Sequence, residues 1–207
     1  MSSDRQFAGF VLAGGASSRM GRAKALLEIG GEPVLVRTVR LVESVAGPAT
    51  VIGNADAYRS LGLRLIDDDL PGGGPLGAIA TALRVSSALW NLVVACDLPY
   101  LTREWLDYLV RRAVASQADA VLPMNVLGVE PLCGAYHKRG EAAIRTALAS
   151  GVRKVTDGLK DLRVEMIEPA EWKAFDSDDL LFKNMNSPED YEEAKARLDA
   201  GARSGER

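Results

Sequence analysis

Short runs of apolar residues alternate along this chain with stretches in which apolar residues recur every three or four positions. Continuous apolar runs are typical of buried strands, and the longer spacing is typical of helices with one buried face. The runs predict strands at residues 7–12, 49–52, 63–66, 92–95, 120–122, 133–136 and 164–167. The spaced stretches predict helices at residues 34–45, 76–83, 101–114 and 140–148.

A further helix is predicted near the C-terminus from its capping residues. Ser187 is the expected N-cap, Pro188 suits the first helical position, and Asp190 is expected to complete a capping box with Ser187.

The order of strands and helices predicts an α/β fold, with a doubly wound, mostly parallel sheet and helices on both faces. No proline-, glycine- or serine-rich linker and no repeat divides the sequence. We therefore expect a single domain over residues 1–200 and a flexible tail over residues 201–207. Ligands of such sheets bind at the carboxyl ends of strands, so the residues that follow strands are the functional candidates.

The first predicted strand runs into a glycine-rich loop that is followed by two cations. The strand ends with Leu12-Ala13-Gly14-Gly15, and Arg19 and Lys24 come shortly after. Glycine lets backbone N–H groups approach phosphate oxygens, and Arg and Lys neutralise their charge. The pattern predicts a nucleoside triphosphate site. The alternative is an ordinary strand-to-helix loop with surface cations.

The spacing of this loop differs from two common phosphate-binding fingerprints. A Walker A loop requires Lys-Ser/Thr directly after its last glycine, and neither Gly15 nor Gly21 has that pair. A dinucleotide-binding loop requires Gly-x-Gly-x-x-Gly at the start of a helix, whereas Gly14 and Gly15 are adjacent. Both fingerprints are therefore excluded.

Asp97 follows the predicted strand at residues 92–95 and is the candidate metal ligand. A carboxylate at this edge faces the ligand crevice, and Mg²⁺ prefers one or two carboxylates together with phosphate oxygens and waters. The alternative is a capping or turn aspartate.

Two further candidates follow the strand at residues 63–66. Asp67, Asp68 and Asp69 either form a solvated turn, which is expected for Asp69, or face the crevice. In the crevice, Asp67 or Asp68 could bind the base or ribose of a nucleotide or hold the waters of the metal. The glycine-rich segment at residues 72–77 is either a flexible turn or a loop that closes over a base.

Polar residues near the C-terminus offer weaker candidates. Asn184 and Asn186 are either helix caps or contacts to a phosphate or a metal-bound water. Arg153-Lys154 either faces solvent or, in the crevice, suits a second phosphorylated substrate. His137, the only histidine, is expected at a strand end, which gives little support to a general base.

Composition narrows the functional classes. The 207 residues carry a net charge of −3 with a pI of about 5.3, so no broad nucleic-acid footprint is visible. No apolar run approaches the roughly 18 residues of a membrane span. Cys96 and Cys133 lie in apolar runs and are expected to be buried free thiols. We expect a cytoplasmic protein that contacts neither nucleic acid nor membrane.

The run at residues 12–27 resembles the signature loop of nucleotidyltransferases with a GT-A-like fold. Within that superfamily the chain is most similar to the MobA-type molybdenum cofactor guanylyltransferases. Further matching segments are Ile66-Asp67-Asp68, Gly74-Pro75-Leu76-Gly77, Ala95-Cys96-Asp97-Leu98-Pro99-Tyr100, Ser150-Gly151-Val152-Arg153-Lys154-Val155 and Asn184-Met185-Asn186-Ser187-Pro188-Glu189-Asp190. The resemblance extends from Leu12 to about Leu198. One departure is Glu130 before Pro131, where the family often has Gln or His.

The resemblance implies a substrate pair and a division of roles. It implies GTP bound by Leu12, Ala13, Gly14, Lys24, Asp68 and Asp97, with Mg²⁺ on Asp97. It also implies transfer of GMP to the phosphate of molybdopterin, with release of pyrophosphate. Transient contact with cofactor-biosynthesis or acceptor proteins is expected. Gly14, where the related cytidylyltransferases usually have alanine, favours GTP over CTP.

The expected mechanism is an in-line attack of a pterin phosphate oxygen on the α-phosphorus of GTP. Amides at residues 13–15, including that of Gly15, would hold the phosphates. Arg19 would grip the β,γ-phosphates, and Lys24 would contact the α-phosphate. The rival hypotheses are a cytidylyltransferase, a sugar-phosphate nucleotidyltransferase and a non-catalytic nucleotide-binding module.

Overall fold

The computed structural model describes residues 6–14, 24–70, 72–176 and 178–204, with side chains described only as far as residue 200. The strands are β1 (Phe7–Ala13), β2 (Glu28–Ile29), β3 (Glu32–Pro33), β4 (Ala49–Gly53), β5 (Leu65–Ile66), β6 (Trp90–Ala95), β7 (Ala120–Asn125), β8 (Gly128–Val129), β9 (Cys133–His137) and β10 (Val164–Ile167). The α-helices are α1 (Val34–Ala46), α2 (Ala55–Tyr58), α3 (Gly74–Val85), α4 (Arg103–Ala115), α5 (Glu141–Ala149), α6 (Val155–Gly158), α7 (Pro169–Trp172) and α8 (Pro188–Ser204). Short 3₁₀ turns lie at Lys24–Leu26, Arg59–Leu61, Lys138–Gly140 and Lys173–Phe175.

The predicted strands form one mostly parallel sheet in the order β10-β7-β9-β6-β1-β4-β5, and β8 pairs with β7. Strand β9 runs antiparallel to both β6 and β7, and the short strand β8 is also antiparallel to β7. The connection from β7 to β9 is a short hairpin through β8, and a parallel return would need a crossover of a dozen or more residues. The expected doubly wound fold is confirmed, with β8 and β9 reversed relative to the other strands.

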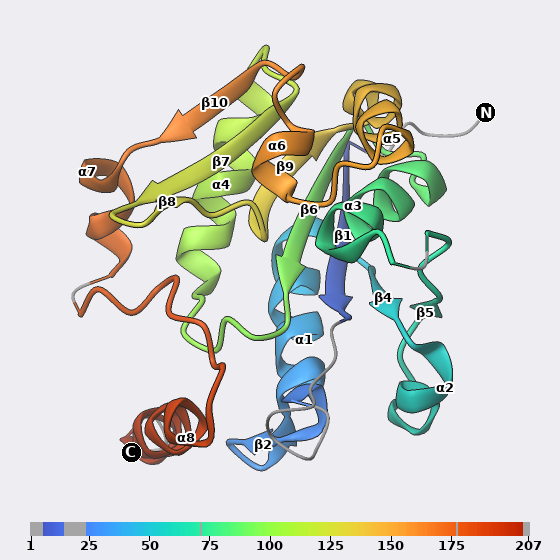
Figure 1. Cartoon of the computed structure of the whole chain (residues 1–207). Helices are drawn as coiled ribbons and strands as arrows, with labels where there is room; N and C mark the ends of the chain where they lie inside the picture. Colours follow the sequence, from blue (N-terminus) through green and yellow to red (C-terminus); the bar gives the residue numbers. More distant parts are fainter. Residues whose placement is uncertain (1–5, 15–23, 71, 177, 205–207) are drawn as a thin grey trace.

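Helices cover both faces of the sheet (Figure 1). The alternation of side chains along β1 shows the two layers. Val11 and Ala13 belong to the core that α1 and α4 complete, whereas Phe10 and Leu12 belong to the core that α3, α5 and α6 complete. This period of two fits a central strand that is buried on both faces.

Helix α8 packs outside these layers, against the β2–β3 hairpin, in a small apolar cluster of its own formed by Ile29, Val34, Met185 and Ala194. The predicted capping box is confirmed: Asp190 N donates to Ser187 Oγ (3.2 Å), and Ser187 N donates to Asp190 Oδ2 (2.8 Å). The helix runs to Ser204 and so includes part of the segment expected to be a tail.

Cys96 and Cys133 are both free and buried, and burial raises the pKa of each thiol to about 12. No helix in the described part of the chain has the combination of length and apolar character that a membrane span requires.

Candidate functional site

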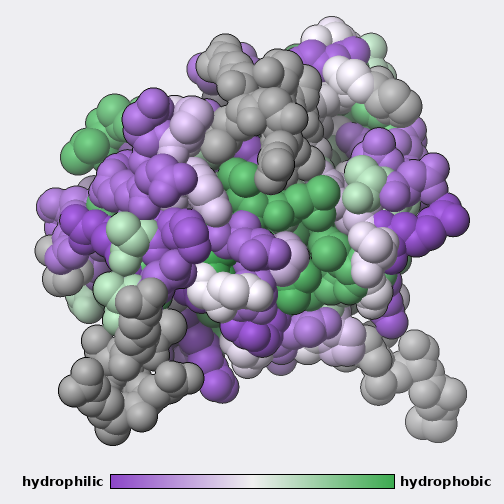
Figure 2. All heavy atoms as spheres, turned by 90° about the horizontal axis from the view of Figure 1, so that it is seen from below, coloured by the Kyte–Doolittle hydropathy of each residue, from purple (hydrophilic) through white to green (hydrophobic). Residues whose placement is uncertain are grey.

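A cavity of about 560 Å³ lies where β1, β4 and β6 end. The surface seen from this side has a hollow with apolar side chains at its centre and polar residues around it (Figure 2). Six residues predicted for the site line the cavity, namely Leu12, Ala13, Gly14, Lys24, Asp68 and Asp97. Arg19 and Gly15 lie outside the described residues, so their roles stay predictions.

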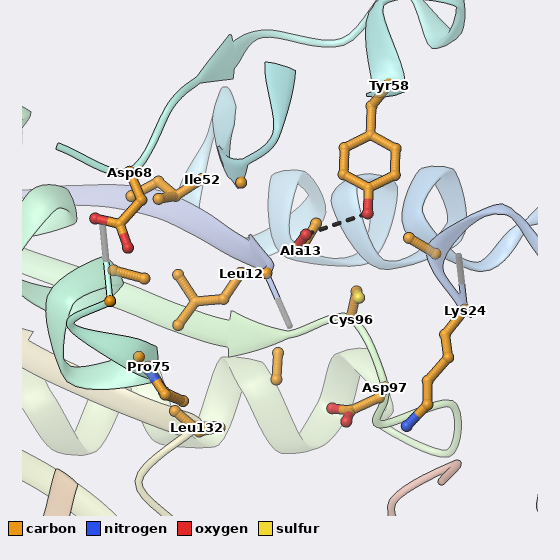
Figure 3. A pocket seen from close by; sticks show the side chains of 17 residues that line it. Leu12, Ala13, Lys24, Ile52, Tyr58, Asp68, Pro75, Cys96, Asp97 and Leu132 are labelled. Carbon is orange, nitrogen blue, oxygen red and sulfur yellow. Dashed lines mark hydrogen bonds between the residues drawn. The ribbon is translucent and has the colours of Figure 1, made fainter. Parts of the chain in front are cut away.

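The two ends of the cavity differ in character (Figure 3). Asp68 lies at one end beside apolar groups that include Ile52 and Pro75, and Lys24 and Asp97 lie together at the other. The first end suits a base, and the second suits charged phosphates.

Asp97 is held in place through its backbone. Cys96 N donates to Leu12 O (3.1 Å), which extends the β6–β1 pairing to the residue before Asp97, and Met185 N donates to Asp97 O (2.9 Å). Burial raises the pKa of the Asp97 carboxyl, and the charge of Lys24 offsets only part of that shift. A carboxylate whose desolvation is only partly offset by nearby positive charge favours a bound cation.

The donor set around Asp97 fits a hard cation such as Mg²⁺, because the side chain offers oxygen. Among the residues that the structure describes, no cluster of three or more His, Cys, Asp or Glu side chains could hold a metal. Mg²⁺ bound beside nucleotides usually takes further ligands from phosphate and water.

The side chain of Lys24 is held by a residue near the C-terminus. Its Nζ donates to Asn186 Oδ1 at 2.7 Å, across a separation of 162 residues. Asn186 precedes α8, and its neighbour Met185 is buried in the cluster with Ile29 and Val34. The Asn-Met-Asn motif thus contains a core anchor, which the sequence did not reveal.

The two asparagines have different surroundings. Asn186 reaches the site through Lys24 and is itself absent from the cavity lining, as is Asn184. Direct contact of either side chain with a phosphate or a metal-bound water stays a prediction.

The three consecutive aspartates point to different partners. Ala55 N donates to Asp67 Oδ1 (2.9 Å), so Asp67 holds the start of α2, and only Asp68 lines the cavity. Asp69 forms an ion pair with Arg84 at 2.6 Å. Asp69 lies exposed in a bend, as the expected solvated turn requires, and its ion pair with Arg84 of α3 is at the surface.

The glycine-rich segment forms the close-packed start of α3. A Cβ on Gly73 would lie 2.9 Å from both Gly77 Cα and Leu70 O, and Gly74 has a φ of +61°. Glycine is required here by backbone packing and conformation. Gly72 and Gly74 nevertheless line the cavity, as the base-binding hypothesis requires.

Tyr58 is a lining residue that sequence reasoning missed. Its hydroxyl donates to Ala13 O at 3.2 Å and ties α2 to the end of β1 (Figure 3). Burial raises the pKa of Tyr58, so the phenol stays neutral. Helix α2 is a single turn, and a hydrophobic period cannot detect an element so short.

Glu130 stands near Asp97 and is the second unusual carboxyl of this edge. Burial, together with the negative charge of Asp97, raises the pKa of Glu130 to about 7. Asn125 Nδ2 donates to Glu130 Oε2 at 3.5 Å. The sequence marked this residue only as a departure from the family pattern.

His137 and Arg153 lie away from the cavity lining. His137 ends β9 and pairs in register with Trp90, the first residue of β6, so it lies at the sheet edge opposite Asp97. The expected strand-end role of His137 is confirmed. Arg153 Nη1 donates to Leu148 O (3.0 Å) and Val152 O (2.9 Å) at the end of α5.

Known proteins resemble this chain over most of its length. A family profile described as "MobA-like NTP transferase domain" matches residues 9–164. A "probable molybdenum cofactor guanylyltransferase" from Pelotomaculum thermopropionicum is 33% identical over 191 residues, which is 92% of each chain. A relative with the same name from Carboxydothermus hydrogenoformans is 32% identical over 182 residues, covering 88% of this chain and 91% of its own.

A solved structure supports the same fold. Molybdopterin-guanine dinucleotide biosynthesis protein A from Archaeoglobus fulgidus superposes with a TM-score of 0.82 at 23% identity. The match covers 93% of this chain and 99% of that one. The two proteins therefore share the whole architecture.

Proposed function

Because this chain belongs to the MobA-like NTP transferase family, we propose that it transfers GMP from GTP to the phosphate of molybdopterin, releasing pyrophosphate. The relatives named molybdenum cofactor guanylyltransferase support this choice of substrates. The nucleotide would lie in the cavity with its base near Asp68 and its phosphates near Lys24.

The observation that carries the proposal is the meeting of Lys24 and Asp97 at one end of a single cavity. The two residues come from separate segments, and a site for a neutral ligand would not need both charges. An ammonium and a carboxylate that can hold a cation together match the charge of a triphosphate.

The chemistry requires positioning and charge neutralisation more than proton transfer. The amide of Gly14 would approach a phosphate oxygen at the end of β1, and Lys24 would neutralise charge that develops on the α-phosphate. Asp97 would hold Mg²⁺, which supplies further charge neutralisation when bound. Arg19 is proposed to grip the β,γ-phosphates.

The attacking group needs no general base from the protein. A phosphate monoester is already anionic near neutral pH. The lone histidine lies at the opposite edge of the sheet, and its pKa is lowered by burial and by Arg139. Both facts agree with a mechanism in which the protein orients two anionic substrates.

A turnover assay with purified molybdopterin and a panel of GTP, CTP and UTP tests the proposal. We expect pyrophosphate release with GTP and a loss of about 100-fold or more in Asp97→Asn. Asp157→Asn is the matched control, because Asp157 is an exposed carboxylate paired with Lys160. Turnover with CTP in preference to GTP, or full activity of Asp97→Asn, would contradict the proposal.

A further inference from the structure

Thr81 is a buried polar residue within the apolar face of α3. It is fully buried, as are Ile79, Ala80 and Ala82 of the same helix. Helical threonines commonly donate to a carbonyl one turn earlier, as Thr38 does to Val34 O at 2.9 Å. Thr81 instead donates to the carboxylates that follow β5, so its hydroxyl is directed toward the cavity wall.

Two carboxylates compete for the single hydroxyl proton of Thr81. Its Oγ1 lies 2.8 Å from Asp68 Oδ1 and also contacts Asp69 Oδ1. Asp69 has a second donor, because Arg84 Nε lies 2.6 Å from Asp69 Oδ2. Asp69 therefore has a donor besides Thr81, whereas Thr81 is the one side-chain donor that the described residues give Asp68.

The hydrogen bonds to Asp68 show which of its two carboxylate oxygens is already engaged within the protein. Leu70 N donates to Asp68 Oδ1 at 3.0 Å, the oxygen that also accepts from Thr81. Among the described residues, Leu70 and Thr81 are the two donors to the Asp68 side chain, and both donate to Oδ1. Oδ2 lies against Gly77, where a Cβ would come within 3.4 Å of it.

Asp68 is the only acidic residue at the apolar end of the described cavity lining, since the other lining carboxylate, Asp97, lies beside Lys24. An acceptor fixed at the base end favours a base that presents adjacent donors. Guanine offers N1–H and the 2-amino group side by side, whereas cytosine offers only its 4-amino group.

We propose that Thr81 is a positioning residue that holds Asp68 in the orientation that recognises the N1–H and 2-amino edge of guanine. This inference rests on the proposed use of GTP and deepens it. Arg84 supports the arrangement through Asp69. A ribose hydroxyl is the competing donor for Asp68, and the choice of nucleotides separates the two.

Equilibrium binding of GTP, ITP and dGTP in the presence of Mg²⁺ and the absence of pterin tests the inference. ITP lacks only the 2-amino group, and dGTP lacks only the 2′-hydroxyl. Removing a hydrogen bond to a charged group reduces affinity by roughly tenfold or more. We expect Thr81→Val to weaken GTP binding about tenfold and ITP binding less, because ITP keeps N1–H and lacks only the 2-amino contact, so that the GTP/ITP preference falls while the GTP/dGTP ratio stays constant.

Two variants control for structural damage. Thr81→Ser keeps the hydroxyl and should restore the GTP/ITP preference. Thr38→Val removes a buried helical hydroxyl from α1 and should leave the preference intact. Equal weakening of GTP and ITP in Thr81→Val, or a change in the GTP/dGTP ratio instead, would overturn the inference. Failure of the wild-type protein to bind GTP would refute the proposed function itself.

Discussion

The two ends of the cavity are built by different means. At the base end, Asp68, Thr81 and Gly73 lie close in sequence and are fixed by packing between one turn and one helix. At the phosphate end, Lys24 depends on Asn186, a residue 162 positions away, and so on the seating of α8. The base end is held by local packing and the phosphate end by contacts between distant segments. Substitutions at the two ends should therefore differ in their effects on stability and activity.

Loss of the cation at the phosphate end should have the largest effect. Lys24→Ala removes a charge expected to act on the transition state, so kcat/KM should fall about 100-fold or more, which is about 3 kcal/mol. The melting temperature should change little, because the Lys24 side chain contacts an exposed asparagine. Steady-state kinetics beside Lys160→Ala, an exposed lysine, gives the comparison. A loss below threefold would remove Lys24 from the mechanism.

Two glycine substitutions, one at each end of the cavity, test whether the ends differ in their contribution to stability. Gly73→Ala should destabilise the fold by about 2 kcal/mol, because its Cβ would meet backbone atoms at 2.9 Å. A Cβ on Gly14 would meet no described atom within 4 Å, so Gly14→Ala should keep its stability and instead weaken GTP binding. Chemical denaturation and calorimetry measure both effects. Equal stability of the two variants would contradict the distinction.

Glu130, beside the phosphate end, should make stability depend on pH. Its folded-state pKa is raised from 4.5 to about 7, so the native state binds more protons than the unfolded state between these values. Stability is therefore lost as the pH rises through this window. Glu130→Gln should be more stable than wild type by about 1 to 2 kcal/mol above pH 7 and equal to it below pH 4.5.

Denaturation curves from pH 4 to 8 measure this difference. The carboxyl of Asp97 and the side chains of Cys133 and Tyr136 also interact electrostatically with Glu130. They are present in both proteins, so the difference isolates Glu130. A constant difference across the pH range would contradict the raised pKa.

The smallest expected effect concerns the contact that orients Lys24. Asn186→Ala removes one hydrogen bond, so kcat/KM should fall about fivefold, or about 1 kcal/mol. The loss should vanish in a Lys24→Ala background, which a double-mutant cycle measures. An undiminished loss in that background would show that Asn186 acts on the substrate independently of Lys24.

Much of the fold was predictable because the strands are buried on both faces. The runs that form β1, β4 and β6 are nearly continuous in apolar residues, and the capping residues Ser187 and Asp190 mark the start of α8. The direction of β9 was not predictable from periodicity, because an apolar strand has the same pattern in both orientations. Helices α2 and α7 are too short to show a period.

The site was predictable wherever a charged residue directly follows a strand. Asp97 follows the end of β6 after a single residue, Cys96, and glycines marked the loop that leaves β1. The sequence could not show which of the three consecutive aspartates faces the cavity. That depends on the orientation of α3, where Thr81 contacts Asp68 and Arg84 pairs with Asp69. Tyr58 and the link between Lys24 and Asn186 arise from tertiary contacts that no local pattern encodes.

A crystal structure with Mg²⁺ and a non-hydrolysable GTP analogue would test the central claim most directly. The account predicts phosphates between the amide of Gly14, Nζ of Lys24 and a metal ion on Asp97, with guanine toward Asp68. A nucleotide bound with its base beside Lys24 and Asp97, or outside this cavity, would contradict it.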